Sequence, residues 1–138
     1  MDCLFCKIVA GDIPAERVYE DDAVIAILDI KPVNPGHVLI IPRKHSDGLH
    51  DADPATLDAT IRAAQKIGQA LLTSGLAQAF NLAQNNGELA GQLIPHLHLH
   101  VIPRRAGDGL KHWPGKAYAS ETEAKEVAEK VRASLVSS

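Results

Sequence analysis

The stretch Pro95-His-Leu-His-Leu-His-Val-Ile-Pro-Arg104 places three histidines at every second position, with leucines between them. Side chains on a β-strand alternate between its faces, so the pattern predicts a strand over residues 96–102 with three imidazoles on one face. Residues two apart lie about 6.5–7 Å apart, so one small anionic group can contact two rings. Three polar rings without partners would be costly. The pattern therefore favours an active site directed at phosphate over a metal site or a structural role.

The length and composition indicate one globular domain over residues 1–138. The chain is 46% hydrophobic and 22% charged, which is ordinary for a soluble protein. Its net charge of −3 argues against a nucleic-acid polymer as partner, because backbone binding needs a basic surface. Its apolar runs are too short to cross a bilayer, and the N-terminus lacks the features of a signal peptide. We therefore expect a cytoplasmic protein without a membrane partner.

Outward from the histidines, the chain alternates apolar runs with turn residues. Asp53-Pro54 is a strong helix start, and a helical apolar stripe then runs through Leu57, Ile61, Ala64, Ile67, Leu71 and Leu72. The short links between neighbouring strands favour a mainly antiparallel α+β fold. The expected strands are residues 17–20, 23–29, 38–41, 77–83 and 96–102, and the expected helices are residues 3–10, 53–75 and 120–135.

Several segments in order resemble the histidine-triad (HIT) superfamily, in particular its zinc-containing nucleotide-binding branch. They are the histidine stretch itself, Cys3-Leu-Phe-Cys-Lys-Ile-Val-Ala-Gly11, the run from Asp29 to His45, Asn85-Asn-Gly87 and Ala90-Gly-Gln92. The resemblance covers residues 3 to about 115. It implies a HIT-like fold with a sheet of about five mainly antiparallel strands, one long central helix and a C-terminal helix.

The resemblance also implies a reaction. His98 would attack the α-phosphorus of a purine nucleoside phosphoramidate or an adenylylated compound, and water would then hydrolyse the nucleotidyl-histidine. A neutral imidazole is a competent nucleophile near pH 7, so the chemistry is consistent with the residue type and needs no cofactor. His100 and Gln92 would assist the transfer. Asn85 and the backbone around Gly91 would donate hydrogen bonds to the phosphate.

Nucleotide recognition is expected elsewhere in the chain. By resemblance, Asp29 would accept hydrogen bonds from the ribose, with a loop-capping role as the alternative. An apolar slot for the purine would consist of Leu4, Phe5, Ile8, Ile27 and Ile30, each of which could equally be ordinary core. Leu93 departs from the family pattern, which usually has a hydroxyl or carboxylate side chain there, so the rate or the preferred leaving group is expected to differ.

Cys3 and Cys6 form a CxxC pair. A disulfide is the weaker interpretation in a reducing compartment, and two thiolates alone cannot complete a tetrahedral zinc site. Spacing does not choose among the seven histidines. The resemblance implies that His45 and His96 complete a structural Cys2His2 zinc site, with free cysteines as the alternative.

Two further functions stay open at this level. One is hydrolysis of dinucleoside polyphosphates, and the other is nucleotide-dependent regulation with little catalysis, which Leu93 keeps open. His112-Trp-Pro-Gly115 resembles a segment of the phosphoramidate-cleaving branch and favours that activity. The family resemblance also implies a homodimer.

Overall fold

The computed structural model describes residues 3–111 and 114–135, and the chain divides into two compact units, residues 1–108 and 109–138. The first unit contains the sheet and both cysteines. The second contains one helix. His112 and Trp113 of the segment that favoured phosphoramidate cleavage lie outside the described residues.

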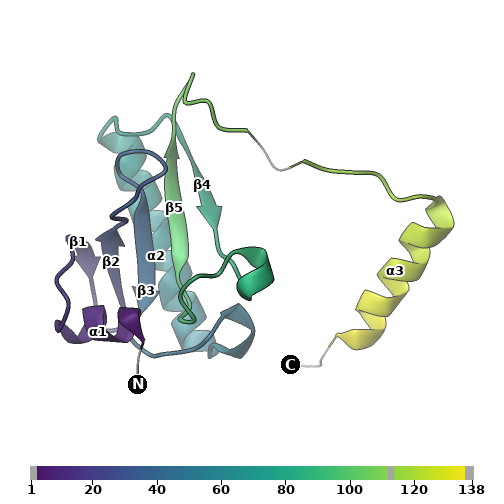
Figure 1. The fold of residues 1–138 in the computed structure, drawn as a ribbon, viewed down its shortest axis with the longest axis horizontal. Coiled ribbons are helices and arrows are strands. Elements are labelled where there is room, and N and C mark those ends of the chain that lie inside the picture. The colour runs from purple at the N-terminus through teal and green to yellow at the C-terminus, as the bar shows by residue number, and fades with distance from the viewer. Residues whose placement is uncertain (1–2, 112–113, 136–138) are drawn as a thin grey trace. The chain divides into compact units, whose positions relative to one another are not determined.

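The first unit is an α+β structure built on one five-stranded sheet, as expected (Figure 1). Every pair of neighbouring strands is antiparallel. In spatial order the strands are β1 (Arg17–Glu20), β2 (Val24–Leu28), β3 (Val38–Pro42), β5 (Leu99–Arg104) and β4 (Ala79–Ala83). The helices are α1 (Leu4–Ala10), α2 (Pro54–Thr73) and α3 (Glu121–Ser134), with short 3-10 turns η1 (Leu49–Asp51) and η2 (Glu88–Ala90).

The central strands are buried on both faces. Val24 and Ala26 of β2 pack with α2, whereas Ile25 and Ile27 pack with α1 on the opposite face. This division follows from the period of two in a strand, and it explains why β2 and β3 are almost continuously apolar. The histidine-bearing β5 lies next to β3, with Val101 in the cluster on the α2 side.

Capping residues mark the start of both helices of this unit, and α2 ends at Thr73, two residues before the predicted end. Cys3 is the N-cap of α1, and Gly11 ends this helix in the left-handed conformation at φ 86°. Asp53 caps α2 by accepting a 2.7 Å hydrogen bond from the amide of Thr56. The predicted stripe of α2 is only partly buried, because Ile61 and Leu72 remain 49% and 45% exposed.

The strand predicted over residues 96–102 begins later, at Leu99, and runs to Arg104. Before it, the amide of Leu97 donates to the carbonyl of Ser46 at 2.8 Å instead of joining the sheet. His96 and His98 therefore precede the strand, and the three imidazoles do not form one straight row. Pro103 lies within β5 and pairs only with Phe80 of β4, since pairing with β3 ends at Val101. A proline is tolerated there because no ladder partner needs its missing amide hydrogen.

The second unit contains α3, none of whose residues is buried. Ser120 caps it by accepting a hydrogen bond from the amide of Glu123 at 3.1 Å. The other half of the expected capping box differs, because the Glu123 carboxylate accepts from Ala119 rather than from the N-cap residue. Across residues 3–111 and 114–135, no helix is both long and apolar enough to cross a membrane.

Candidate active site and metal centre

The loop between β2 and β3 places Asp29 and His37 against β5. The amide of Asp29 donates to the carbonyl of His37 at 2.9 Å, and one Asp29 carboxylate oxygen caps the amide of Lys31 at 2.8 Å. The Asn34 amide group donates to the carbonyl of Pro103 at 2.8 Å and so fastens the loop to the sheet. The two ends of the loop are thereby held together, and its middle is fastened to β5.

A chain of hydrogen bonds determines which nitrogen of His100 carries its proton. The backbone amide of Val33 donates to Nδ1 of His37 at 3.0 Å, so this nitrogen has no hydrogen. The proton of neutral His37 is then on Nε2, which lies 2.9 Å from Nδ1 of His100 and donates to it. Neutral His100 consequently carries its own proton on Nε2. It is a hydrogen-bond donor at that atom.

His98 is the opposite tautomer to His100, with its hydrogen on Nδ1. Its Nδ1 lies 2.7 Å from the backbone carbonyl oxygen of His96, which can only accept, so Nδ1 carries the proton. Nε2 of neutral His98 therefore has a free lone pair. The ring of Phe5 packs edge-on at 4.9 Å between centroids, and the ring of His100 lies at 5.0 Å. A lone-pair nitrogen and an N–H donor are thus held on neighbouring rings.

Burial keeps these rings neutral. It lowers the pKa of His98 and of His37 below the usual histidine value of 6.5, and the carboxylate of Asp29 opposes the shift in both. For His100, burial and the neighbouring rings of His98 and His37 lower the pKa to about 4. Neutral imidazoles are the forms that can act as nucleophile and N–H donor near pH 7.

The loop of residues 84–92 precedes the histidines, and it is here called the phosphate loop after the role that the sequence analysis predicts for it. Gly87 and Gly91 both have φ of 93°, a conformation that side chains with a Cβ rarely adopt. The Gln92 side chain closes the loop, since its oxygen accepts from the amide of Gly87 at 2.8 Å. The Asn85 amide group donates to the carbonyl of Gly91 at 3.5 Å. The loop therefore has a defined backbone in which Asn85 and Gly91 lie together.

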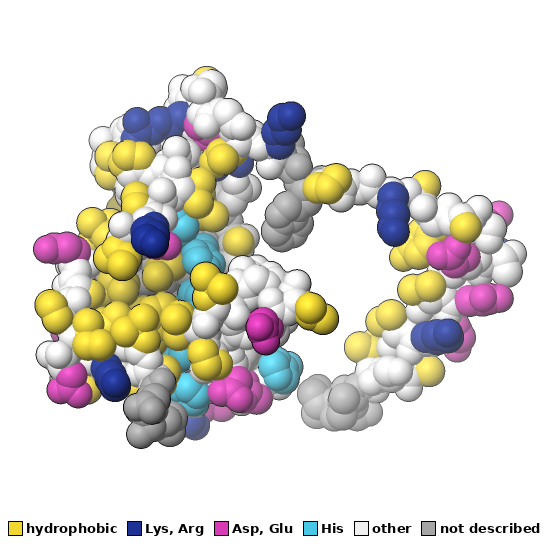
Figure 2. Space-filling model, in the orientation of Figure 1, with side chains coloured by type: hydrophobic (Ala, Val, Ile, Leu, Met, Phe, Trp, Pro, Cys, Tyr) yellow, Lys and Arg dark blue, Asp and Glu magenta, His cyan; other side chains and the backbone are white. Residues whose placement is uncertain are grey.

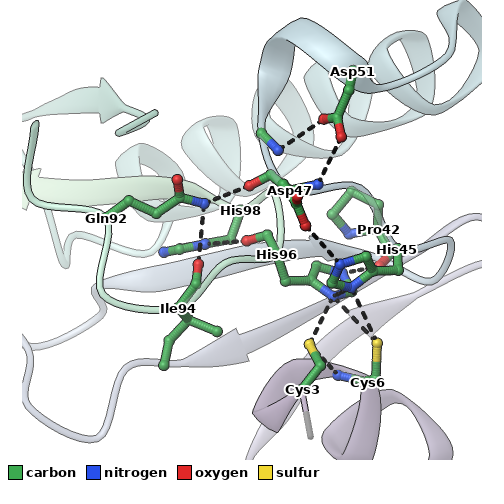
Figure 3. A network of polar contacts seen from close by, with 11 residues as sticks. Cys3, Cys6, Pro42, His45, Asp47, Asp51, Gln92, Ile94, His96 and His98 are labelled. Carbon is green, nitrogen blue, oxygen red and sulfur yellow. Dashed lines mark hydrogen bonds and ion pairs between the residues drawn. The ribbon is translucent and has the colours of Figure 1, made fainter. Parts of the chain in front are cut away.

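Cys3, Cys6, His45 and His96 form one cluster at the N-terminal end of α1 (Figure 3). All four ligand atoms lie within 4.8 Å of one another. Nδ1 of His96 is 3.3 Å from the Cys3 sulfur and 3.5 Å from the Cys6 sulfur, and it is 3.1 Å from Nδ1 of His45. A tetrahedral zinc site with usual bond lengths has ligand–ligand separations of about 3.3–3.8 Å. The four side chains fit such an ion.

The outer contacts of the two histidines direct lone pairs into this cluster. Nε2 of His96 donates to the carbonyl of Pro42 at 2.8 Å, and Nε2 of His45 donates to the carboxylate of Asp47 at 3.0 Å. Both protons are therefore on Nε2, and both Nδ1 atoms are free to bind a cation. Burial raises the pKa of the Cys6 thiol, with Cys3 adding to the shift. A bound cation would offset that shift by favouring the thiolate.

Asp29, His37 and His100 form a second group of possible metal ligands. Its hydrogen bonds argue against a metal. Because Val33 donates to Nδ1 of His37, the nitrogen that faces His100 carries a hydrogen and offers no lone pair. The hydrogen bonds of this group fix which ring nitrogens carry hydrogens. The cysteine-containing cluster instead has lone pairs on its ring nitrogens that are available to a metal ion.

The residues expected to form the purine slot do not share one environment. Phe5, Ile8 and Ile27 are buried in the core on the α1 face. Leu4 is 41% exposed and Ile30 is 92% exposed. Figure 2 shows hydrophobic side chains beside the histidines on the face that it presents. The other predicted site residue with an apolar side chain, Leu93, is 87% exposed.

A family model described as the HIT domain matches residues 10–107. The chain belongs to the HIT family. A solved HIT-family structure from Bacillus subtilis superposes with a TM-score of 0.90 at 35% identity, covering 100% of both chains. A zinc-bound histidine triad family protein from Mycobacterium smegmatis superposes with a TM-score of 0.77 at 41% identity, covering 96% of this chain and 98% of that one.

Among curated relatives of this HIT protein is an adenosine 5'-monophosphoramidase of Schizosaccharomyces pombe. It is 36% identical over 104 residues, which are 75% of each chain. The family membership, the fold and a Cys/His cluster that fits a metal therefore agree with the sequence analysis.

Sequence reasoning did not find the backbone groups that orient the histidines. The amide of Val33 and the carbonyls of Pro42 and His96 have no signature in the sequence, because every residue offers such groups. Asp47 was also missed. Its position two residues after His45 is a signal that could have identified it, since carboxylates commonly orient metal-binding histidines.

The lowered pKa of His100 predicts a specific dependence of stability on pH. Between about pH 6.5 and pH 4 the unfolded chain binds a proton that the folded protein does not, so this residue makes folding less favourable as the pH falls through that window. In an NMR titration, the imidazole signals of His100 should have a midpoint near 4. The variant His100→Gln identifies the signals and should flatten the stability profile. A midpoint near 6.5 would contradict the burial argument.

Proposed function

We propose that this HIT protein hydrolyses purine nucleoside phosphoramidates or related adenylylated compounds at the α-phosphate. The observation that carries the proposal is the proton arrangement of two adjacent rings. His98 presents a lone pair on Nε2, and His100 presents an N–H group on its own Nε2. The S. pombe relative, named as an adenosine 5'-monophosphoramidase, supports this substrate class.

In the first step, Nε2 of His98 attacks the α-phosphorus and forms a P–N bond as the bond to the leaving amine breaks. The His98 ring becomes positively charged, and its Nδ1–H remains on the carbonyl of His96. This hydrogen bond strengthens as the ring gains charge, so it stabilises the transition state. The leaving nitrogen takes up one proton from solvent, so the amine departs as a neutral molecule.

His100 is proposed to donate a hydrogen bond from Nε2 to a phosphoryl oxygen or to the leaving group, and it keeps its proton throughout. His37 holds it in the required tautomer through the 2.9 Å contact. In the second step, water attacks the phosphorus of the nucleotidyl-histidine, the P–N bond breaks, and one proton of the water passes to solvent. The products are the nucleoside monophosphate and neutral His98. The same two rings therefore serve both steps.

The remaining predicted residues would bind the nucleotide around these rings. Asp29 lies 3.6 Å from Nε2 of His37 and has one oxygen that does not cap the loop, so we propose that it accepts from the ribose hydroxyls. Asn85 and the backbone at Gly91 would donate to the phosphate. Five apolar residues would contact the base: exposed Leu4 and Ile30, together with Ile27, Ile8 and Phe5 of the core on the α1 face.

We further propose that Cys3, Cys6, His45 and His96 hold a structural zinc ion. Four protein ligands would fill the tetrahedral site, so the ion supplies cross-linking of the chain and no activated water. The fit of the ligand distances and the zinc-bound relative from M. smegmatis support this assignment. Such a cross-link joins α1 to the segment that precedes β5.

The edge of the sheet at β4 supports a proposed homodimer. Ile61, Phe80 and Leu82 line a groove of about 500 Å³ where α2 meets this strand. The opposite edge strand, β1, has an irregular register between Arg17 and Tyr19, which discourages pairing. Two β4 strands can pair about a two-fold axis because an antiparallel pair of identical strands is self-complementary. A second copy is therefore the proposed occupant of this groove.

Substitution of the proposed nucleophile separates catalysis from binding. His98→Ala should lower kcat on adenosine phosphoramidate by at least about a thousandfold, because no other group forms the covalent bond. Binding of AMP, measured by calorimetry, should change by less than about tenfold. Lys130→Ala, which alters an exposed residue of α3 outside both clusters, is the control. Near-normal turnover by His98→Ala would refute the assignment.

Faster cleavage of a diadenosine polyphosphate by the unaltered protein would point to the alternative substrate class.

Metal analysis tests the proposed zinc site. Protein purified without chelator should contain about one zinc per chain, and Cys3→Ser should lose most of it because tetrahedral thiolate–imidazole sites need all four ligands. Lys130→Ala again serves as the control. A content below about 0.2 zinc per chain in the unaltered protein would rule out the site.

The proposed dimer is tested by light scattering. Leu82→Glu places a charge on the apolar edge and should shift the protein toward the monomer mass, since a buried unpaired carboxylate opposes association. Val18→Glu is the matched control, because Val18 is 49% exposed on the other edge strand. A monomer mass for the unaltered chain, or a dimer unaffected by Leu82→Glu, would contradict the proposal.

A further inference from the structure

Residues 45–51 are here called the linking segment. At one end the segment contributes His45 to the Cys/His cluster, here called the metal cluster, and further along it contacts the phosphate loop. His45 contributes its Nδ1 to the cluster, 3.4 Å from the Cys6 sulfur. Two residues later, the carbonyl of Asp47 accepts from the side-chain amide of Gln92 at 2.5 Å. The amide of Leu49 donates to the side-chain oxygen of Asn86 at 2.7 Å. The segment therefore joins two sites that the sequence keeps about forty residues apart.

Asp47 uses both its side chain and its backbone in this connection (Figure 3). Its carboxylate accepts from Nε2 of His45 at 3.0 Å, which directs Nδ1 of that ring into the cluster. Its carbonyl binds Gln92. Asp51 holds the backbone between these contacts, because its carboxylate accepts from the amides of Asp47 at 3.2 Å and Gly48 at 2.9 Å. A change in the position of His45 is thus passed directly to the partner of Gln92.

Gln92 has no free amide group for a substrate. Its oxygen accepts from the amide of Gly87, and its nitrogen donates to the carbonyls of Asp47 and Ile94, the latter at 3.1 Å. An NH₂ group has two hydrogens, and both are used by these carbonyls. The side chain therefore connects three backbone positions. Its contact with Gly87 sets one end of the phosphate loop.

We propose that Asp47 and Gln92 are positioning residues that couple occupation of the metal cluster to phosphate binding. A cation bound by Nδ1 of His45 restricts this ring, and with it Asp47. The hydrogen bond from Gln92 to Asp47 then holds the phosphate loop in the form that places Asn85 and Gly91 together. In this role Asp47 and Gln92 act through the position of the phosphate loop and do not touch the reacting atoms.

The inference deepens the proposed function and rests on it, because its probe is a nucleoside monophosphate that must bind at the phosphate loop. Coupling between two binding sites is reciprocal. If the metal orders the loop for phosphate, then phosphate binding must tighten the metal site by the same factor. The affinity for the metal is therefore a readout that needs no catalysis.

The experiment measures the affinity of the full-length protein for Zn²⁺ by chelator competition, with and without saturating AMP. In the unaltered protein, AMP should tighten Zn²⁺ binding by at least about fivefold, the low end of usual allosteric coupling. Gln92→Met keeps the length of the side chain and removes its hydrogen bonds. It should lower this factor at least threefold, while Zn²⁺ affinity without AMP stays within about threefold.

Gln78→Met is the matched control, since Gln78 is exposed and its side chain binds the amide of Ala106, away from both sites. It should retain the full effect of AMP. Circular dichroism and thermal melting of all three proteins establish that they are folded. If AMP binds but leaves Zn²⁺ affinity unchanged, or if Gln92→Met keeps the effect of the unaltered protein, the inference is wrong and the proposed function stands. If AMP does not bind to the unaltered protein at all, both are overturned.

Discussion

His96 is the residue on which the rest of the site depends, because both its ring and its backbone carbonyl make contacts that the site needs. Its ring enters the cluster with both cysteines, and its backbone carbonyl holds the Nδ1 proton of His98. The ring is completely buried, and Nε2 is fixed by the carbonyl of Pro42 on β3. The ring and the carbonyl are attached to the same Cα, and contacts on both sides hold that residue in place. The orientation of His98 is therefore tied to the cluster through a single residue.

Backbone groups decide the chemistry of the histidines in this structure. A carbonyl oxygen can only accept and an amide can only donate, so each imposes one tautomer on the ring that it meets. The carbonyl of His96 leaves a lone pair on Nε2 of His98. The amide of Val33, acting through His37, leaves a hydrogen on Nε2 of His100. Two identical side chains two positions apart thus acquire opposite roles without a charged neighbour in direct contact.

The small helix α1 has a larger part in the site than its seven residues indicate. Its N-cap and first turn supply both cysteines, and Phe5 packs against His98. The same helix closes the core on one face of the sheet through Phe5 and Ile8. Phe5 contributes to the burial of His98, and burial lowers the pKa of that ring. Core packing, two residues of the Cys/His cluster and a ring contact with His98 consequently come from one structural element.

Much of the fold followed from local pattern, because capping residues, glycines and alternating apolar residues act over a few positions. Asp53-Pro54 marked the start of α2, and the short links between strands indicated an antiparallel sheet. The start of β5 was missed, since the amide of Leu97 bonds to Ser46, a residue far away in the sequence. The exposure of Ile61 and Leu72 was missed for a similar reason, as helical spacing does not tell how wide a face the sheet covers.

The sequence by itself determined which residue types were available: three alternating histidines, a CxxC pair and a glycine-rich loop, in an order that resembles the HIT family. Resemblance also pointed to His45 and His96 as partners of the cysteines, and the structure brings these four side chains together. Only the tertiary structure decided the tautomers, the buried state of the rings and the connection from Asp47 to Gln92. Those properties depend on backbone donors and acceptors brought together from distant segments, and such groups are the same in every residue.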